Sequence, residues 1–120
     1  LGYEASLTEY FEGTMDIETH IKKQIADNSV ILYMKGTPQF PQCGFSARTV
    51  EALTQVGEPF AYVNILENPE IRSTLPRIAN WPTFPQLWVK GELIGGCDIV
   101  MDMVQKGELA PLIKEAVVKA

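Results

Sequence analysis

Residues 43–46 (CGFS) are the segment of this sequence whose residue types and position are best suited to chemistry. They stand where a loop with one glycine and two prolines, residues 35–42, passes into a helical pattern. The first turn of a helix presents free backbone N–H groups and the positive end of the helix dipole. Both lower the pKa of a thiol, so we expect Cys43 to be a reactive thiolate rather than an inert, half-buried cysteine. Lys35, at the end of the preceding strand, could add positive charge beside it.

Ser46 occupies the position at which a dithiol oxidoreductase carries its second cysteine. In such an enzyme the second thiol attacks the mixed disulfide and releases the product. A serine hydroxyl cannot do this, so an oxidised Cys43 would need an external thiol, or the distant Cys97, to resolve it. The sequence therefore argues against a general disulfide reductase and leaves a redox role for Cys97 open as an alternative.

Two further segments, residues 81–86 (WPTFPQ) and 95–98 (GGCD), contain prolines and glycines that could give the backbone a conformation suited to ligand binding. Pro85 either follows a cis peptide bond in a functional turn or begins an edge strand in trans, and the residues alone leave both open. The glycine pair allows close backbone approach, and the helix start after it could bind a carboxylate through N–H groups. Asp98 could cap that helix, pair with the ammonium of a ligand, or do both. We assign Trp81 to packing.

The elements that position these segments alternate between helix and strand. Apolar spacing and turn residues predict helices over residues 16–28, 44–56, 68–78, 98–105 and 109–118, and strands over 30–34, 60–65, 86–89 and 92–94. A strand–helix–strand unit crosses over right-handed and makes a parallel pair, whereas a hairpin makes an antiparallel pair. The pattern predicts an α/β fold with a four-stranded mixed sheet flanked by helices on both faces.

The 120 residues suit one domain, which we place at residues 15–120. Residues 1–14 show no clean periodicity and precede an internal Met15, so we interpret them as an added expression leader, disordered or tag-like, and set them aside. A natural acidic N-terminus is the alternative. His20 is far in sequence from every motif, so we expect it to be exposed and not to bind a metal.

The bulk composition argues against several classes of function. Hydrophobic residues make up 46% and charged residues 21%, as in ordinary globular proteins. A formal net charge of −5 argues against a nucleic-acid binder, and no apolar run reaches the roughly 20 residues of a membrane helix. Two cysteines are too few for a disulfide-stapled secreted domain, and there is no signal-peptide pattern. We therefore expect a cytoplasmic protein without membrane or nucleic-acid partners.

Taken together, these motifs resemble those of the monothiol glutaredoxins of the C-G-F-S class. The segments that carry the resemblance occur in the family's order and spacing: residues 35–38 (KGTP), Pro41, 43–46, 81–86 and 95–98. The resemblance covers about residues 15–120. It implies the thioredoxin fold, a cis peptide bond before Pro85, and the single-domain bacterial or organellar form of the family.

The resemblance also implies a glutathione site. The binding residues that it implies are Lys35, Arg72, Phe84, Cys97 and Asp98. Glutathione has two carboxylates, one ammonium and one thiol. Lys35 and Arg72 could take the glycine carboxylate, and the turn at residues 97–98 could hold the γ-glutamyl end. The backbone of Phe84 would pair with the extended peptide, as an added strand does, and the glutathione thiol would lie beside Cys43.

The metal that the resemblance implies is a 2Fe–2S cluster bound by Cys43. Such a cluster usually takes four thiolates, which two protomers and two glutathione molecules would supply together. The chain would then be a homodimer when cluster-bound and a monomer when apo. Exchangeable glutathione ligands would make the cluster labile, which suits its transfer to acceptor apo-proteins. The resemblance further implies a BolA-type partner.

Two other functions remain open. Cys43 could be the nucleophile of a glutathione-dependent thiol–disulfide oxidoreductase that removes glutathione from protein thiols. Ser46 and the long loop at residues 37–42 favour the cluster carrier over this enzyme, so we expect weak or no classical oxidoreductase activity. The third possibility is a thioredoxin-fold adaptor without redox chemistry.

Overall fold

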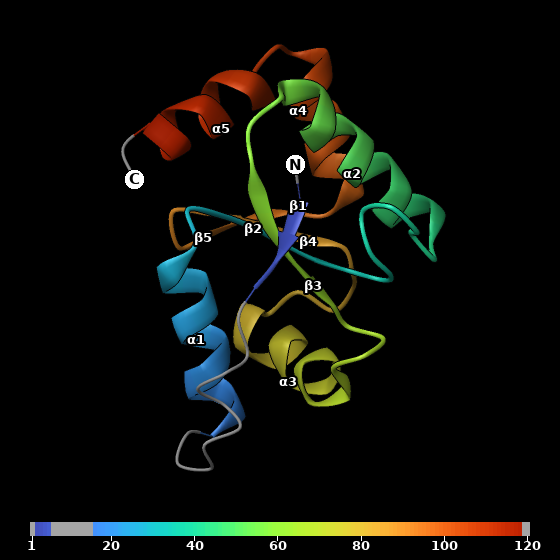
Figure 1. Ribbon diagram of the computed structural model, residues 1–120, viewed down its shortest axis with the longest axis vertical. Helices are drawn as coiled ribbons and strands as arrows, with labels where there is room; N and C mark the ends of the chain where they lie inside the picture. Colours follow the sequence, from blue (N-terminus) through green and yellow to red (C-terminus); the bar gives the residue numbers. More distant parts are fainter. Residues whose placement is uncertain (1, 6–15, 119–120) are drawn as a thin grey trace.

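The computed structural model describes residues 2–5 and 16–118, which form one mixed β-sheet with helices on both faces (Figure 1). The strands are β1 (Gly2–Glu4), β2 (Val30–Met34), β3 (Phe60–Asn64), β4 (Gln86–Val89) and β5 (Glu92–Gly95). They lie in the order β1-β3-β2-β4-β5. The first three strands of that order run parallel, whereas β4 is antiparallel to β2 and β5 is antiparallel to β4.

The helices form two layers. They are α1 (Ile17–Asp27), α2 (Gly44–Val56), α3 (Pro69–Ala79), α4 (Cys97–Gln105) and α5 (Leu109–Val118). Side chains of α1 and α3 share one core with the sheet, and side chains of α2, α4 and α5 share the other. The two groups lie on opposite sides of the strands in Figure 1. This arrangement matches the α/β fold that the sequence predicts and the thioredoxin fold that the resemblance implies.

The central strand β2 is buried by both helical layers. Val30, Leu32 and Met34 belong to the core beneath α2, α4 and α5, whereas Ile31 and Tyr33 belong to the core beneath α1 and α3. Successive side chains of a strand point to opposite faces, so a strand covered on both faces requires a continuous apolar run. That run is what the sequence shows at these positions.

The sheet has five strands rather than the four predicted, because β1 comes from the segment that we set aside. Gly2–Glu4 pairs in parallel with β3, and the N–H of Ala5 donates to the carbonyl of Tyr62 at 3.0 Å. A strand of three residues is too short to show a two-residue periodicity, so the sequence carried no signal for it. Residues 1 and 6–15 lie outside the described part of the chain, and the interpretation of residues 1–14 as an added leader stays a prediction.

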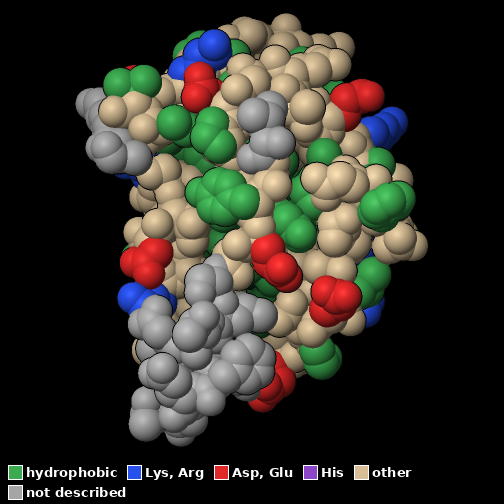
Figure 2. All heavy atoms as spheres, viewed as in Figure 1, with side chains coloured by type: hydrophobic (Ala, Val, Ile, Leu, Met, Phe, Trp, Pro, Cys, Tyr) green, Lys and Arg blue, Asp and Glu red, His purple; other side chains and the backbone are tan. Residues whose placement is uncertain are grey.

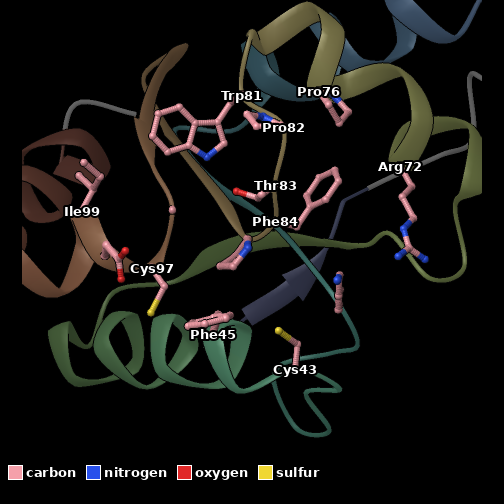
Figure 3. A pocket seen from close by; sticks show the side chains of 14 residues that line it. Cys43, Phe45, Arg72, Pro76, Trp81, Pro82, Thr83, Phe84, Cys97 and Ile99 are labelled. Atoms are coloured by element: carbon pink, nitrogen blue, oxygen red, sulfur yellow. The ribbon is translucent and has the colours of Figure 1, made fainter.

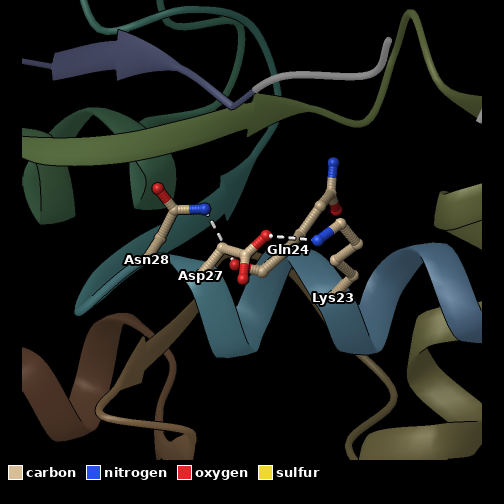
Figure 4. Close-up of polar contacts among 4 residues, drawn as sticks. All are labelled: Lys23, Gln24, Asp27 and Asn28. Carbon is tan, nitrogen blue, oxygen red and sulfur yellow. Dashed lines mark hydrogen bonds and ion pairs between the residues drawn. The ribbon is translucent and has the colours of Figure 1, made fainter. Parts of the chain in front are cut away.

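Side-chain hydrogen bonds mark both ends of α1. Asp16 is the N-cap, and its carboxylate accepts from the N–H of Thr19 at 2.8 Å. At the other end, the side-chain amide of Asn28 donates to the carbonyl of Gln24 at 2.8 Å (Figure 4). Capping of this kind satisfies backbone groups that the helix itself leaves unpaired.

His20 is buried, and the expectation that it is exposed was wrong. It lies on the buried face of α1 together with Ile21 and Gln24, and only 3% of its surface is accessible. The isoleucines at four-residue spacing mark only part of the buried face of this helix, which also includes the neighbouring polar side chains of His20 and Gln24.

The surface drawn in Figure 2 carries acidic and basic side chains scattered among neutral groups, and its hydrophobic side chains form several separate areas. Within residues 2–5 and 16–118, no helix combines the length and the apolar character needed to cross a bilayer. That the protein lacks nucleic-acid and membrane partners stays a prediction.

Candidate functional site

A pocket of about 720 Å³ opens beside the N-terminus of α2 (Figure 3). Four regions that are far apart in the sequence line it: the loop and first turn around Cys43, helix α3, the segment before β4, and the start of α4. All six residues singled out from the sequence are among the lining residues: Lys35, Cys43, Arg72, Phe84, Cys97 and Asp98. The structure therefore brings these six residues together, while their roles in binding and catalysis stay predictions.

Cys43 is the N-cap residue of α2, with an extended backbone (φ −151°) and a half-buried side chain. The backbone N–H of Ser46 is the main cause that lowers the pKa of the thiol, and burial opposes it by disfavouring the charged form. The N–H of Phe45, the positive charge of Lys35 and the hydroxyl of Ser46 lower the pKa further. The first turn of α2 thus acts on the thiol mainly through its backbone N–H groups, which stabilise the thiolate form.

The loop between β2 and α2 folds back on itself. The N–H of Gln42 donates to the carbonyl of Lys35 at 2.9 Å, and Thr37 and Phe40 exchange two backbone hydrogen bonds at 3.3 and 3.0 Å. Gly36 has a φ of +95°, and a Cβ placed on it would lie 2.6 Å from the carbonyl oxygen of Phe40. Glycine is therefore required there, and the closed loop keeps the thiol and the lysine at the same pocket.

The segment before β4 presents an open backbone to the pocket. The peptide bond between Phe84 and Pro85 is cis, as the resemblance implied and as the residues alone did not decide. Gln86 is fully buried, and its side-chain amide donates to the carbonyls of Trp81 at 3.0 Å and Thr83 at 3.3 Å, which holds the segment in place. Within the described chain, the backbone N–H and C=O of Phe84 form no hydrogen bond, so both are available to an extended ligand.

The turn from β5 into α4 forms another wall of the pocket. Gly95 has a φ of +144°, and a Cβ on it would lie 2.7 Å from the side chain of Ile99. Gly96 is the N-cap of α4, so the helix begins at Cys97, one residue earlier than predicted. Asp98 is exposed inside the first turn and does not cap the helix, which removes capping as its role. The Cys97 side chain is buried, with 6% of its surface accessible.

Opposite charges lie toward the two ends of this pocket. Figure 3 shows Arg72 at one end and Cys97 at the other, with Cys43 between them. Lys35 adds a second cation to the lining, and Asp98, next to Cys97 in the chain, adds a carboxylate. Such a pocket suits an extended zwitterion that carries a carboxylate at one end and an ammonium at the other.

Residues 30–94 match the family model for glutaredoxin. The chain is 64% identical over 105 residues to glutaredoxin 4 of Haemophilus ducreyi, an overlap that covers 88% of this chain and 98% of that protein. It is 65% identical over 99 residues to glutaredoxin 4 of Escherichia coli strain K12, covering 82% of this chain and 86% of that one. The chain belongs to the glutaredoxin family.

The solved structure of a plant glutaredoxin supports the same fold. The reduced apo form of poplar GrxS14 superposes with a TM-score of 0.74 at 44% identity, covering 88% of this chain and 96% of that one. This likeness confirms the thioredoxin fold for the chain. The fifth strand, β1, is an addition at the edge of the four strands that the sequence pattern predicted.

The glutaredoxin is of the monothiol C-G-F-S class, because Cys43 is followed by Ser46 where a dithiol member has a second cysteine. Both of its cysteines are free thiols. Membership of the family implies the use of glutathione, whose charges fit the two ends of the pocket.

Several lining residues of this glutaredoxin were missed or given another role from the sequence. Trp81, assigned to packing, lines the pocket, and its indole N–H is buried without a hydrogen-bond partner in the described chain. Pro76 follows Arg72 by one helical turn, and that spacing could have placed it on the same face. Ile99 gave no sequence signal, because an apolar residue in a first helical turn points to a core as readily as to a pocket.

Proposed function

We propose that this glutaredoxin binds a 2Fe–2S cluster between two copies of the chain and transfers it to acceptor apo-proteins. The observation that carries the proposal is the ligand supply of one chain. Cys43 is a half-buried thiol at the pocket with a lowered pKa, whereas the Cys97 side chain is buried. No group of three metal-ligating side chains occurs within residues 2–5 and 16–118.

Four thiolates would be assembled from two Cys43 side chains and two glutathione molecules, one in each pocket. Lys35 and Arg72 would hold the glycine carboxylate, the free backbone of Phe84 would pair with the peptide, and residues 97–98 would hold the γ-glutamyl end. The glutathione sulfur would then lie next to Cys43. The cluster is cargo in this scheme, so ligands that exchange readily favour its release.

The partners that follow from this proposal are a second copy of the chain, a BolA-type protein in place of that copy, and acceptor apo-proteins. Phe40 and Phe45 flank Cys43 in sequence and expose 74% and 57% of their surface. Exposed apolar side chains so near Cys43 in the chain suit contacts with a second protein across a bridging cluster. Two free thiols suit a reducing compartment, and we propose the cytoplasm.

A second candidate function is favoured by the lowered pKa of Cys43. In a glutathione-dependent oxidoreductase, the Cys43 thiolate would attack the glutathione sulfur of a protein–glutathione mixed disulfide and release the protein thiol. A second glutathione would then reduce the enzyme and leave as glutathione disulfide. Ser46 cannot resolve an intramolecular disulfide, so this route depends entirely on external glutathione.

Anaerobic reconstitution with iron, sulfide and glutathione tests the proposal, with visible absorption and gel filtration as readouts. The cluster carrier is expected to give a coloured dimer that requires glutathione and is lost in Cys43→Ala. A colourless monomer, combined with rapid turnover in a glutathione-coupled disulfide assay, would instead support the oxidoreductase.

A further inference from the structure

The hydroxyl of Ser46 makes a contact that its role as a missing second cysteine does not explain. Ser46 lies in the first turn of α2 and is fully buried. Its oxygen accepts a hydrogen bond from the backbone N–H of Lys35 at 3.2 Å. This bond joins the end of β2 to the start of α2 across the loop that separates them.

A few hydrogen bonds hold the backbone at Lys35 in place. Its carbonyl accepts from Gln42, and the N–H of the next residue, Gly36, donates to the buried side-chain oxygen of Asn64 at 2.9 Å. The bond to Ser46 satisfies the N–H of Lys35 itself. This hydrogen bond is partly buried, and an N–H that loses its acceptor in such a place is costly, so removing the hydroxyl would favour a shifted backbone at Lys35.

A lysine depends on its backbone for position more than most residues. Its ammonium lies at the end of a flexible four-carbon chain. Any movement of the Cα therefore adds to the range of positions that the ammonium can occupy. The Lys35 side chain is half-buried and lines the pocket. Fixing its Cα therefore limits where the ammonium can meet a carboxylate.

We infer that Ser46 is a positioning residue for glutathione: its hydroxyl holds the backbone of Lys35 so that the lysine ammonium meets the glycine carboxylate of the ligand. This inference rests on the proposed function, which places glutathione in this pocket. The fourth residue of the motif thus has a positive role, in addition to the lack of a resolving thiol. A cysteine at this position would weaken the contact, because sulfur is a poor hydrogen-bond acceptor.

The test compares two ligands on the reduced full chain by amide NMR titration: glutathione, and glutathione whose glycine carboxylate is converted to an amide. The wild-type chain is expected to prefer glutathione. Ser46→Ala should weaken glutathione binding by about three- to tenfold, with less than about a twofold change for the amide. The amide of Lys35 should also exchange with solvent about tenfold faster.

Thr49→Val is the matched control. Thr49 is also a fully buried hydroxyl residue of α2, but its hydroxyl donates to the carbonyl of Phe45 within the same helix. This variant should leave the preference between the two ligands at the wild-type value. A general loosening of the helix would lower the affinity for both ligands equally in both variants. A positioning role lowers only the affinity for glutathione, and only in Ser46→Ala.

Ser46→Cys provides a second variant of similar volume should Ser46→Ala not fold, and the same loss of preference is expected under reducing conditions. Unchanged preference in a folded Ser46 variant would overturn the inference. Lys35→Met separates this outcome from failure of the proposed function. If Lys35→Met loses the preference and the Ser46 variants keep it, only the inference fails. If the wild type binds both ligands equally, the proposed placement of glutathione fails with it.

Discussion

At the scale of single residues, the chemistry of this protein depends on one thiol whose surroundings favour its ionised form. The Cys43 sulfur lies at the start of α2, where the N–H of Ser46 lowers its pKa more than burial raises it. Part of this effect comes from Lys35, which lies across the loop and not within the helix. The reactivity of the thiol is thus set jointly by a helix start and by a neighbouring strand end.

The rate of alkylation of Cys43 by iodoacetamide should therefore rise with pH around a midpoint below that of an ordinary cysteine, about 8.5. Only the thiolate reacts, so the midpoint reports the pKa. Folding lowers this pKa, so the ionisation of Cys43 adds to the free energy of unfolding. This contribution is complete above the pKa of the unfolded thiol and is lost as pH falls through the pKa of the folded thiol. Mass spectrometry of the modified peptide measures the rate, and the urea-denatured chain is the control. Equal midpoints in the two states would contradict this expectation.

Arg72 and Arg77 offer a matched pair on α3, because both are exposed but only Arg72 lines the pocket. Arg72→Gln should weaken glutathione binding by about tenfold, or ~1.4 kcal/mol, since a charge-assisted hydrogen bond to the glycine carboxylate is lost. Arg77→Gln should leave the affinity unchanged. Calorimetric titration at low ionic strength measures both, and an equal loss in the two variants would show that only the general charge of the helix matters.

At the scale of elements, the loop between β2 and α2 is shaped by close backbone contacts. Gly36 adopts a positive φ and leaves no room for a side chain, since a Cβ would also lie 2.7 Å from the backbone nitrogen of Gln42. The side chain of Asn64 accepts from the N–H groups of both Gly36 and Leu66 and so ties this loop to the end of β3. The position of the pocket wall depends on these contacts.

Gly36→Ala is expected to lower the free energy of unfolding by about 3 kcal/mol, from left-handed strain of roughly 1–2 kcal/mol and an added backbone clash. Gly57→Ala is the control, because Gly57 also has a positive φ (+88°) but nothing lies within 4 Å of its Cβ position. That variant should lose only about 1 kcal/mol. Urea unfolding measures both changes, and equal losses would mean that the loop yields to the extra methyl group.

At the scale of the whole molecule, strands β3, β2, β4 and β5 would remain paired as one sheet without the edge strand β1. β1 is an edge strand of three residues, and among the described residues both cores are built from the elements after Asp16 apart from the small side chain of Ala5. A shortened chain that starts at Met15 should therefore fold, with a loss of about 1–2 kcal/mol for the few hydrogen bonds of β1.

Thermal unfolding followed by circular dichroism, with a glutathione titration of the same sample, measures the effect of this truncation. Glutathione affinity should stay within twofold of that of the full chain, because no residue of β1 lines the pocket. A truncated chain that fails to fold, or that loses the ligand, would show that residues 1–14 belong to the working domain.

The sequence by itself determined the features that depend on local order along the chain. These include a cysteine at a helix start, the apolar run of β2, the turn glycines and the succession of helices and strands, because capping, periodicity and glycine preferences act between near neighbours. The motifs together determined the family. The cis bond before Pro85 followed from the family resemblance and not from the residues themselves.

Only the tertiary structure decided which distant side chains meet. The family resemblance had already grouped Arg72 with Cys43, but the structure added Trp81, Pro76 and Ile99 to their pocket, paired the Ser46 hydroxyl with Lys35, buried His20 and added β1 to the sheet. These outcomes depend on how layers pack and on which sheet edge remains free, and such long-range contacts leave no periodic trace in the sequence. Six residues of the pocket, the thiol among them, could therefore be named from the chain, through its motifs and the family that they resemble, whereas the remaining pocket wall and the contacts that position it required the fold.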